Sequence, residues 1–186
     1  MNLRIPISSV FLCLIIFGAA FARGQKMRAG TLTETEIEQV REAAVFPVIR
    51  VNLYTKFLGD RAIKIRNLVN RPKSAQRVIE LDDSLQDFTS LMDEMGSNLD
   101  QYSDRHSDIR KALKPLTEAM PRWLTILRSV PGESGFDLSR KEAIESGEEL
   151  MDQATRLLHE QEEYFATHKD EKDQERNDDT VKPKPE

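Results

Sequence analysis

The sequence predicts an all-α protein: an antiparallel hairpin of long helices with a coiled-coil-like core, forming a bundle of three to four helices and followed by a disordered charged tail. Aromatic residues make up 6% of the 186 residues and charged residues 32%, with only 8 Gly and 8 Pro. This composition disfavours β-sandwiches and barrels, which need frequent turns and aromatic or β-branched strands. Apolar residues also recur at spacings of three and four along most of the chain, which is the period of amphipathic helices.

Residues 1–22 have the three-part layout of a secretory signal. A basic start at Arg4 precedes an apolar run from Val10 to Ile16, and the segment ends Ala20-Phe21-Ala22. This ending matches the small-residue cleavage site of exported proteins. We therefore expect cleavage after Ala22, a periplasmic or extracellular protein, and no membrane span once the signal is removed. An uncleaved membrane anchor is the alternative.

The one cysteine, Cys13, lies within that apolar run. Its loss with the signal predicts a mature chain without disulfides, thiolate metal sites or a cysteine nucleophile, so the fold would depend on packing. Residues 23–32 are a polar lead-in, and residues 33–168 are the predicted helical domain. Residues 169–186 are charged and end Lys-Pro-Lys-Pro-Glu. Such a tail cannot bury enough apolar area to offset the entropy of ordering, and we expect it to be disordered.

A capping box opens the helical domain. The Thr33 hydroxyl can accept from the Glu36 amide while the Glu36 side chain reaches back to the amide of Thr33. The apolar pattern then continues as far as Val69. Pro47 lies inside this pattern, and because proline cannot donate a backbone hydrogen bond, it predicts a kink or split near Phe46.

A turn at residues 70–73, with Ser74 as a cap, precedes the longest apolar pattern of the chain. We expect one long helix here, or collinear helices kinked at Pro115 and Pro121. A reversal at Gly96-Ser97-Asn98 is the alternative. The pattern keeps heptad spacing through Val78, Leu81, Leu85, Phe88, Met92, Met95, Leu99, Tyr102, His106, Ile109, Leu113, Leu116, Met120, Trp123, Leu127 and Val130.

The last helix is expected after a break at residues 131–135, which contain one proline and two glycines. Ser139 and Glu142 are expected to form a second capping box. The apolar stripe of this helix fades near His168, where the predicted tail begins.

Charge is strongly segregated between the first two long patterns. Residues 50–77 contain eight cations and one acid, whereas residues 78–104 contain eight acids and neither Lys nor Arg. Folding the chain back about residues 71–72 sets these runs face to face, so we expect mutual pairing rather than nucleic-acid binding. The predicted pairs are Arg61 with Asp82, Lys56 with Asp87, and Arg50 with Asp93.

Candidate chemistry is sparse. His159 and Glu163 share a helical face and are weak candidates for a metal site, although a solvated pair is the more ordinary arrangement. His106 occupies the apolar stripe, where a hydrogen-bonded core or interface histidine is expected. Met92 and Met95 are expected to fill the core. No Gly-x-Ser-x-Gly elbow, His-Glu-x-x-His pair or phosphate-binding glycine loop occurs, so we assign no catalytic residue and no cofactor.

Two segments resemble known families. Leu32-Thr33-Glu34-Thr35-Glu36, opening a helix after an export signal, looks like the Leu-Thr-x-x-Gln motif of Spy-like and CpxP-like periplasmic stress chaperones and their metal-sensor relatives, with Glu36 in place of the glutamine. Residues 50–61, with the helices that follow, are similar to uncharacterised secreted helical proteins of environmental bacteria such as acidobacteria. The first resemblance implies a chaperone or sensor role, and the second implies no activity.

These observations predict an exported, non-enzymatic protein that acts by protein–protein interaction in the cell envelope, as a scaffold or chaperone-like binder. Its partner would be another protein, or a second copy bound through helical faces. A metal-responsive periplasmic sensor using His159 and Glu163 is the alternative, and an enzyme is the remaining class.

Overall fold

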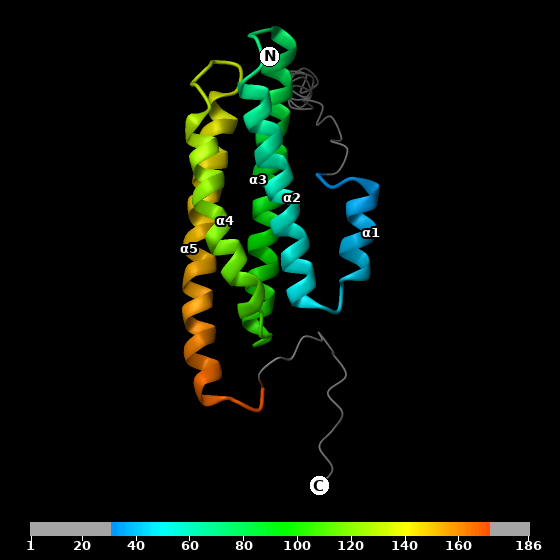
Figure 1. Cartoon of the computed structure of the whole chain (residues 1–186), viewed down its shortest axis with the longest axis vertical. Coiled ribbons are helices and arrows are strands. Elements are labelled where there is room, and N and C mark those ends of the chain that lie inside the picture. The colour runs from blue at the N-terminus through cyan, green and yellow to red at the C-terminus, as the bar shows by residue number, and fades with distance from the viewer. Residues whose placement is uncertain (1–30, 172–186) are drawn as a thin grey trace, which may run out of the picture. The chain divides into compact units, whose positions relative to one another are not determined.

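The computed structural model describes residues 31–171, and these residues form five α-helices and no β-strand. The helices are α1 (Glu34–Glu42), α2 (Pro47–Val69), α3 (Ala75–Asp104), α4 (Arg110–Ser129) and α5 (Asp137–Thr167) (Figure 1). The predicted all-α fold is confirmed. The predicted signal segment and most of the predicted lead-in and tail lie outside the described residues.

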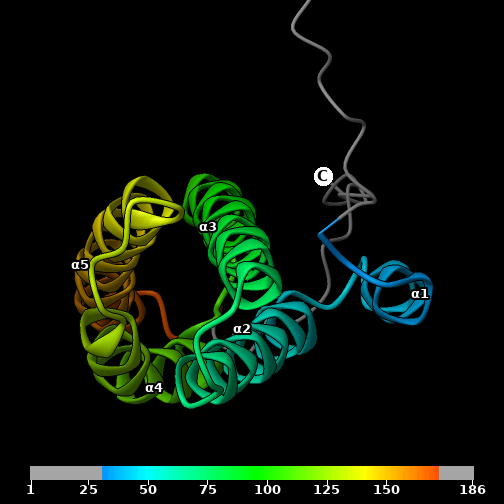
Figure 2. The ribbon, with the colours of Figure 1, turned by 90° about the horizontal axis from the view of Figure 1, so that it is seen from above.

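Helices α2 to α5 form a four-helix bundle, and α1 packs on the outside of α2. Seen along the bundle, the four helices follow one another around a ring in the order α2, α3, α5 and α4 (Figure 2). Helices that are consecutive in the chain run in opposite directions, so the ring neighbours α3 and α5 are parallel, as are α4 and α2. Helices α3 and α4 are consecutive in the chain but lie diagonally opposite each other, so the short connection between them crosses the end of the bundle.

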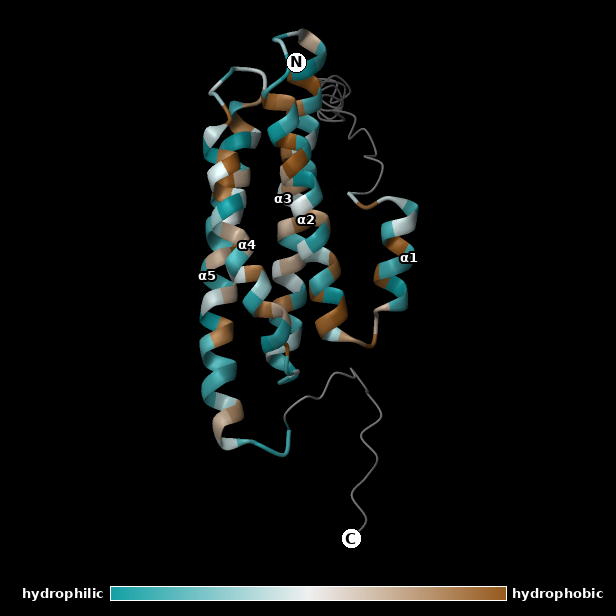
Figure 3. Ribbon diagram, viewed as in Figure 1, coloured by the Kyte–Doolittle hydropathy of each residue, from teal (hydrophilic) through white to brown (hydrophobic). Residues whose placement is uncertain are grey.

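The core is built from the predicted apolar stripes. Apolar and polar residues alternate along each helix (Figure 3), and every member of the longest stripe except Val78 and His106 is buried. Met92 and Met95 fill the core as predicted. The rings of Phe88 on α3 and Trp123 on α4 meet edge to face, with centroids 6.2 Å apart, so the core spans the diagonal of the bundle.

The first two helices begin as the sequence predicts. Thr33 and Glu36 form the complete capping box, with the Thr33 amide donating to Glu36 Oε2 at 2.8 Å and the Glu36 amide donating to Thr33 Oγ1 at 3.2 Å. The predicted break near Phe46 is a full split, because α1 ends at Glu42 and Pro47 is the first residue of α2. The first turn of a helix accepts proline, since its missing N–H would have no partner there.

Helix α3 continues through Gly96, so the alternative of a reversal at that glycine is wrong. Gly96 instead allows a close approach between α3 and α5. Gln153 donates to the Gly96 carbonyl oxygen at 3.1 Å, and a Cβ at this position would lie 3.0 Å from Gln153 Oε1.

The expectation of one long or collinear helix across residues 78–130 is also wrong, because the chain reverses between Asp104 and Arg110. His106 adopts a left-handed backbone conformation with φ of 50°. The heptad spacing persists across this turn because α3 and α4 both face the same core. Pro115 and Pro121 lie inside α4, which continues through both.

The predicted pairing of Arg61 with Asp82 is wrong. Arg61 forms a bidentate ion pair with Glu36 of α1, in which its two terminal nitrogens lie 2.9 and 2.6 Å from the carboxylate oxygens. The Lys56 Nζ lies 3.4 Å from the Asp60 carboxylate on its own helix. Helices α2 and α3 are joined instead by Arg71 and Glu80 at 2.7 Å, and by a hydrogen bond from Tyr54 to Glu94. No ion pair joins Arg50 to Asp93 among residues 31–171.

The second predicted capping box is wrong as well. Helix α5 begins at Asp137, two residues before Ser139, and no side chain caps it. Ser139 points across to α3 and donates a 2.5 Å hydrogen bond to Asp82. This contact engages the carboxylate that the sequence pattern assigned to Arg61.

Candidate functional site

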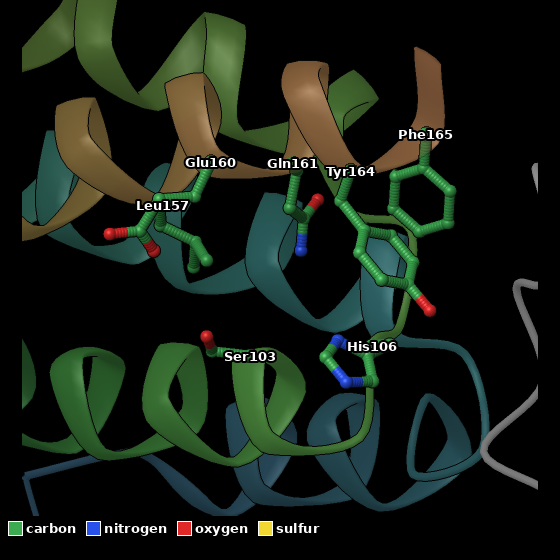
Figure 4. A pocket seen from close by; sticks show the side chains of 7 residues that line it. All are labelled: Ser103, His106, Leu157, Glu160, Gln161, Tyr164 and Phe165. Atoms are coloured by element: carbon green, nitrogen blue, oxygen red, sulfur yellow. The ribbon is translucent and has the colours of Figure 1, made fainter. Parts of the chain in front are cut away.

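An open pocket lies between the end of α3 and the last turns of α5, and we call it the α3–α5 pocket. It has a volume of about 150 Å³. Figure 4 shows its lining, with α3 on one side and α5 on the other. The lining residues are Ser103 and His106 from the end of α3 and its turn, and Leu157, Glu160, Gln161, Tyr164 and Phe165 from α5.

The spacing of the α5 residues explains how they come together. Leu157, Gln161 and Phe165 recur every four residues, which places them on one face of the helix, and all three are buried. Glu160 and Tyr164 lie on the adjacent flank at the same spacing. The inner wall of the pocket is therefore apolar, apart from the amide of Gln161.

Gln161 hydrogen-bonds the α3–α4 turn, which forms the wall of the pocket opposite α5. Its Oε1 accepts from the backbone amide of Ile109 at 3.0 Å, and its Nε2 donates to the carbonyl oxygen of Ser107 at 2.9 Å. Both polar ends of this buried side chain are thus engaged with a segment more than fifty residues away. Because those bonds fix residues 107–109, they also set the position of the preceding His106.

Three rings stack beside the pocket. The His106 ring lies parallel to Tyr164, with centroids 4.6 Å apart and an interplanar angle of 6°, and His168 covers the opposite face of Tyr164 at 4.0 Å and 8°. The Tyr164 hydroxyl donates to Glu171 at 2.7 Å. That hydrogen bond, followed by partial burial, raises the pKa of the Tyr164 hydroxyl. Tyr164 is therefore held on both faces and at its hydroxyl.

His106 does not occupy the position that the sequence predicts. It was expected to be a core or interface histidine, but it is exposed and lies in the α3–α4 turn. The stripe pattern correctly singled out this residue, but it could not show that the helix ends two residues earlier.

The structure brings the candidate metal ligands His159 and Glu163 to within 3.4 Å of each other, yet each side chain is 72% exposed. The neighbouring carboxylates are engaged elsewhere, Glu160 with Arg156 and Glu162 with Lys114. Among residues 31–171, no three His, Cys, Asp or Glu side chains gather closely enough to hold a metal ion. The described part of the chain therefore offers His159 and Glu163 no third protein ligand.

A polar cluster around the buried Tyr54, between α2 and α3, was not predicted. Tyr54 is fully buried and donates its hydroxyl to Glu94. Burial, followed by the bond to Glu94, raises the pKa of Tyr54 to about 12. Arg50 approaches the same hydroxyl from the preceding turn, and its Nε is buried without a hydrogen-bond partner in the described structure. The apolar pattern of the sequence did not single out Tyr54, and no sequence signal showed its partner.

Comparison of the chain with protein families, with curated proteins and with solved structures finds no match. The resemblances to Spy-like chaperones and to acidobacterial secreted proteins therefore stay predictions. Within residues 31–171, no helix combines the length and the apolar character needed to cross a membrane.

Proposed function

We propose that the protein is an exported, non-enzymatic binding protein of the cell envelope that holds a segment of another polypeptide at the α3–α5 pocket. It would act as a scaffold or as a chaperone-like binder. The observation that carries this proposal is the pocket itself, an open recess whose wall is formed by Leu157, Phe165 and the edge of Tyr164.

The size of the pocket supports a single side chain as its occupant. A cavity of about 150 Å³ lined by apolar residues accommodates a molecule of the size of benzene, and the α3–α5 pocket has this volume. Protein interfaces commonly depend on one or a few apolar anchors seated in such pockets. An aromatic or branched aliphatic side chain of a partner polypeptide therefore fits.

The rim of the pocket carries polar side chains that can form hydrogen bonds with the backbone of the partner polypeptide. The Ser103 hydroxyl forms no hydrogen bond with any other described residue, and it faces α5 across the pocket (Figure 4). The Glu160 carboxylate and the His106 imidazole complete the rim. Because these side chains can accept or donate, they suit the amide and carbonyl groups on either side of an apolar anchor.

The proposal is tested by filling the pocket. Ser103→Trp places an indole in the recess, and Ser90→Trp makes the same change at an exposed site of α3 that does not line the pocket. We measure how each variant slows the light scattering of a reduced, unfolding client such as α-lactalbumin. Wild type and Ser90→Trp should suppress aggregation, whereas Ser103→Trp should lose most of this effect, about tenfold or more in the concentration required.

Two outcomes contradict the proposal. One is a wild-type protein that leaves client aggregation unchanged while also retaining no segment from a library of apolar peptides. The other is equal activity of Ser103→Trp and Ser90→Trp, both folded by circular dichroism, because binding would then not use the pocket.

The second candidate function is a metal-responsive sensor, favoured by the close approach of His159 and Glu163. Two ligands on an exposed helical face bind a divalent ion weakly unless water or a second molecule completes the coordination. Zn²⁺ should then raise the melting temperature of wild type and leave His159→Ala unaffected. No rise in wild type would remove this candidate.

A further inference from the structure

We propose that the protein forms a homodimer through the outer face of α2 and α3, with a second copy covering the groove between these two helices. The groove has a volume of about 440 Å³, and we call it the α2–α3 groove. The residues that carry the argument are Ile63 and Lys64 on α2, Arg71 in the turn that follows α2, and Glu80 and Asp83 on α3.

The groove presents apolar side chains that residues 31–171 leave exposed. Its lining includes Ile63, which is 46% exposed, and the buried Leu68. Ile79 is 55% exposed and lies one helical turn before Asp83 on α3. Two large aliphatic side chains thus flank a recess on one face of the bundle, as expected of an interface that another surface covers.

The walls of the groove carry opposite charges. Helix α2 lies within the basic run of the sequence and α3 within the acidic run. Arg71 and Glu80 already pair across the top of the groove at 2.7 Å. Lys64 and Asp83 line the same groove, yet neither forms an ion pair with any described residue.

This charge pattern complements itself. A twofold axis parallel to the helices places α2 of one copy over α3 of the other, so a basic wall meets an acidic wall twice in the same dimer. Arg71 lies level with Glu80, and Tyr54 lies level with Glu94. By this register, Lys64 and Asp83 differ in height by about one helical turn, which a lysine side chain spans. Lys64 of each copy therefore reaches Asp83 of the other.

A second copy fits the groove better than an unrelated partner because Lys64 and Asp83, on opposite walls, form no ion pair with any described residue. The sequence pattern suggested that the two runs neutralise each other within one chain. In the structure, however, Arg61 forms an ion pair with Glu36, and Lys56 forms one with Asp60. The part of the segregated charge that lines the groove, at Lys64 and Asp83, then has its complement in another molecule of the same chain.

The test is sedimentation equilibrium of the purified chain, with charge reversals on each wall. Wild type should be a reversible dimer that weakens as salt is raised, because exposed pairs are screened. Lys64→Glu and Asp83→Lys should each raise the dimer dissociation constant by about tenfold or more, since each change replaces two attractive contacts by two repulsive ones. Combining both reversals should restore dimerisation to within about threefold of wild type.

Arg66→Glu is the matched control. It makes the same change of net charge on α2 at an exposed arginine that does not line the groove, and it should leave the dissociation constant unchanged. The proposal is overturned by a wild-type chain that stays monomeric at every concentration up to about 0.5 mM, a range that includes weak complexes. It is equally overturned if the double reversal fails to recover what the single reversals lose while circular dichroism shows all variants folded. The pocket variant Ser103→Trp should dimerise like wild type. The dimer proposal and the pocket-binding proposal can therefore be contradicted independently of each other.

Discussion

Gln161 lies on the buried face of α5, and its amide holds the connection between α3 and α4 at both ends. The chain reverses there without a glycine or proline between Asp104 and Arg110. The turn therefore lacks the two residue types that mark turns most strongly, and its local signal is limited to the Ser and Asp residues at 103, 104, 107 and 108. Hydrogen bonds to Gln161 of α5 stabilise this turn. Because that partner is distant in the sequence, the heptad pattern predicted one continuous helix instead of a turn.

Replacing Gln161 by Leu tests this role. The change leaves the Ile109 amide and the Ser107 carbonyl oxygen without these partners, and it should lower the free energy of unfolding by about 2 to 4 kcal/mol. Urea denaturation followed by circular dichroism measures the loss. Gln76→Leu, at an exposed position of α3, should cost less than about 0.5 kcal/mol. Equal losses in the two variants would show that the Gln161 amide does not stabilise the turn.

Tyr54 offers a second test at the scale of one residue. Its pKa is raised in the folded state to about 12, by burial first and then by the bond to Glu94. The folded protein therefore holds this proton more tightly than the unfolded chain, whose tyrosines ionise near pH 10. The stabilisation is complete below that pH and is lost as the pH rises through the folded pKa.

We expect Tyr54→Phe to remove the part of the phenol absorbance titration that appears near pH 12. The same variant should flatten the fall in unfolding free energy between about pH 10 and 12. At pH 7 it should cost about 1 kcal/mol, because the Glu94 carboxylate loses its donor. Spectrophotometric titration at alkaline pH and urea denaturation check both parts. A titration that is unchanged in Tyr54→Phe would contradict the assignment.

Helix α1 is attached to the rest of the described structure through α2 alone, and none of its side chains is fully buried. Arg61 bonds both carboxylate oxygens of Glu36 and also donates to the Thr31 carbonyl oxygen at 3.2 Å. Partial burial raises the pKa of Glu36, but the bonds from Arg61 and Thr33 outweigh it and leave this pKa below its ordinary value. The attachment of α1 is therefore complete above the ordinary pKa and is lost as the pH falls through the lowered one.

Glu36→Gln separates the attachment of α1 from its folding. Glutamine preserves the capping box, whereas the ion pair with Arg61 disappears. Amide protection in α1 should fall by about tenfold, corresponding to 1 to 2 kcal/mol, while protection in α2 to α5 stays the same. Hydrogen exchange near neutral pH measures this difference. A fall in protection spread over the whole bundle would show that α1 is part of its cooperative core.

Substitution of Gly135 and of Gly59 by alanine should change the free energy of unfolding in opposite directions. An added Cβ at Gly135 would lie 2.3 Å from Val78 Cγ1, whereas one at Gly59, inside α2, has no neighbour closer than 3.9 Å. Gly135→Ala should therefore lower the unfolding free energy by about 1 to 3 kcal/mol. Gly59→Ala should raise it by about 0.5 to 1 kcal/mol.

Thermal unfolding of both variants checks this contrast. Truncation of the colliding side chain in a Gly135→Ala, Val78→Ala double variant should recover part of the loss, because the two residues are in contact. The explanation fails if the double variant is as unstable as the sum of the two single changes.

At the scale of the whole molecule, export stays a prediction, because residues 1–22 lie outside the described structure. Expression of the full chain in a bacterial host should yield a mature protein that begins at Arg23 and is recovered outside the cytoplasm. Mass spectrometry of the intact product measures the cleavage point. Replacing Ala20 and Ala22 by Leu should block processing, and an unprocessed wild-type product would point to the membrane-anchor alternative.

The amino-acid sequence was enough to predict the helical class, most of the buried stripe positions, the capping box at Thr33 and the break before Pro47. These features are local: a helical period, a hydroxyl three residues from an amide, and a proline without an N–H each act over a few neighbouring residues. Local geometry therefore sufficed to predict them, and the structure confirms each one.

The reversal between α3 and α4, the partner of Arg61 and the pocket that His106 lines became visible in the folded chain alone. Each depends on residues far apart in the chain: Gln161 bonds residues 107–109, Glu36 meets Arg61 from a separate helix, and Tyr164 stacks on His106. Heptad spacing is the same for one long helix and for two helices that face the same core. The sequence pattern could therefore show which side chains are buried, but not which of them meet.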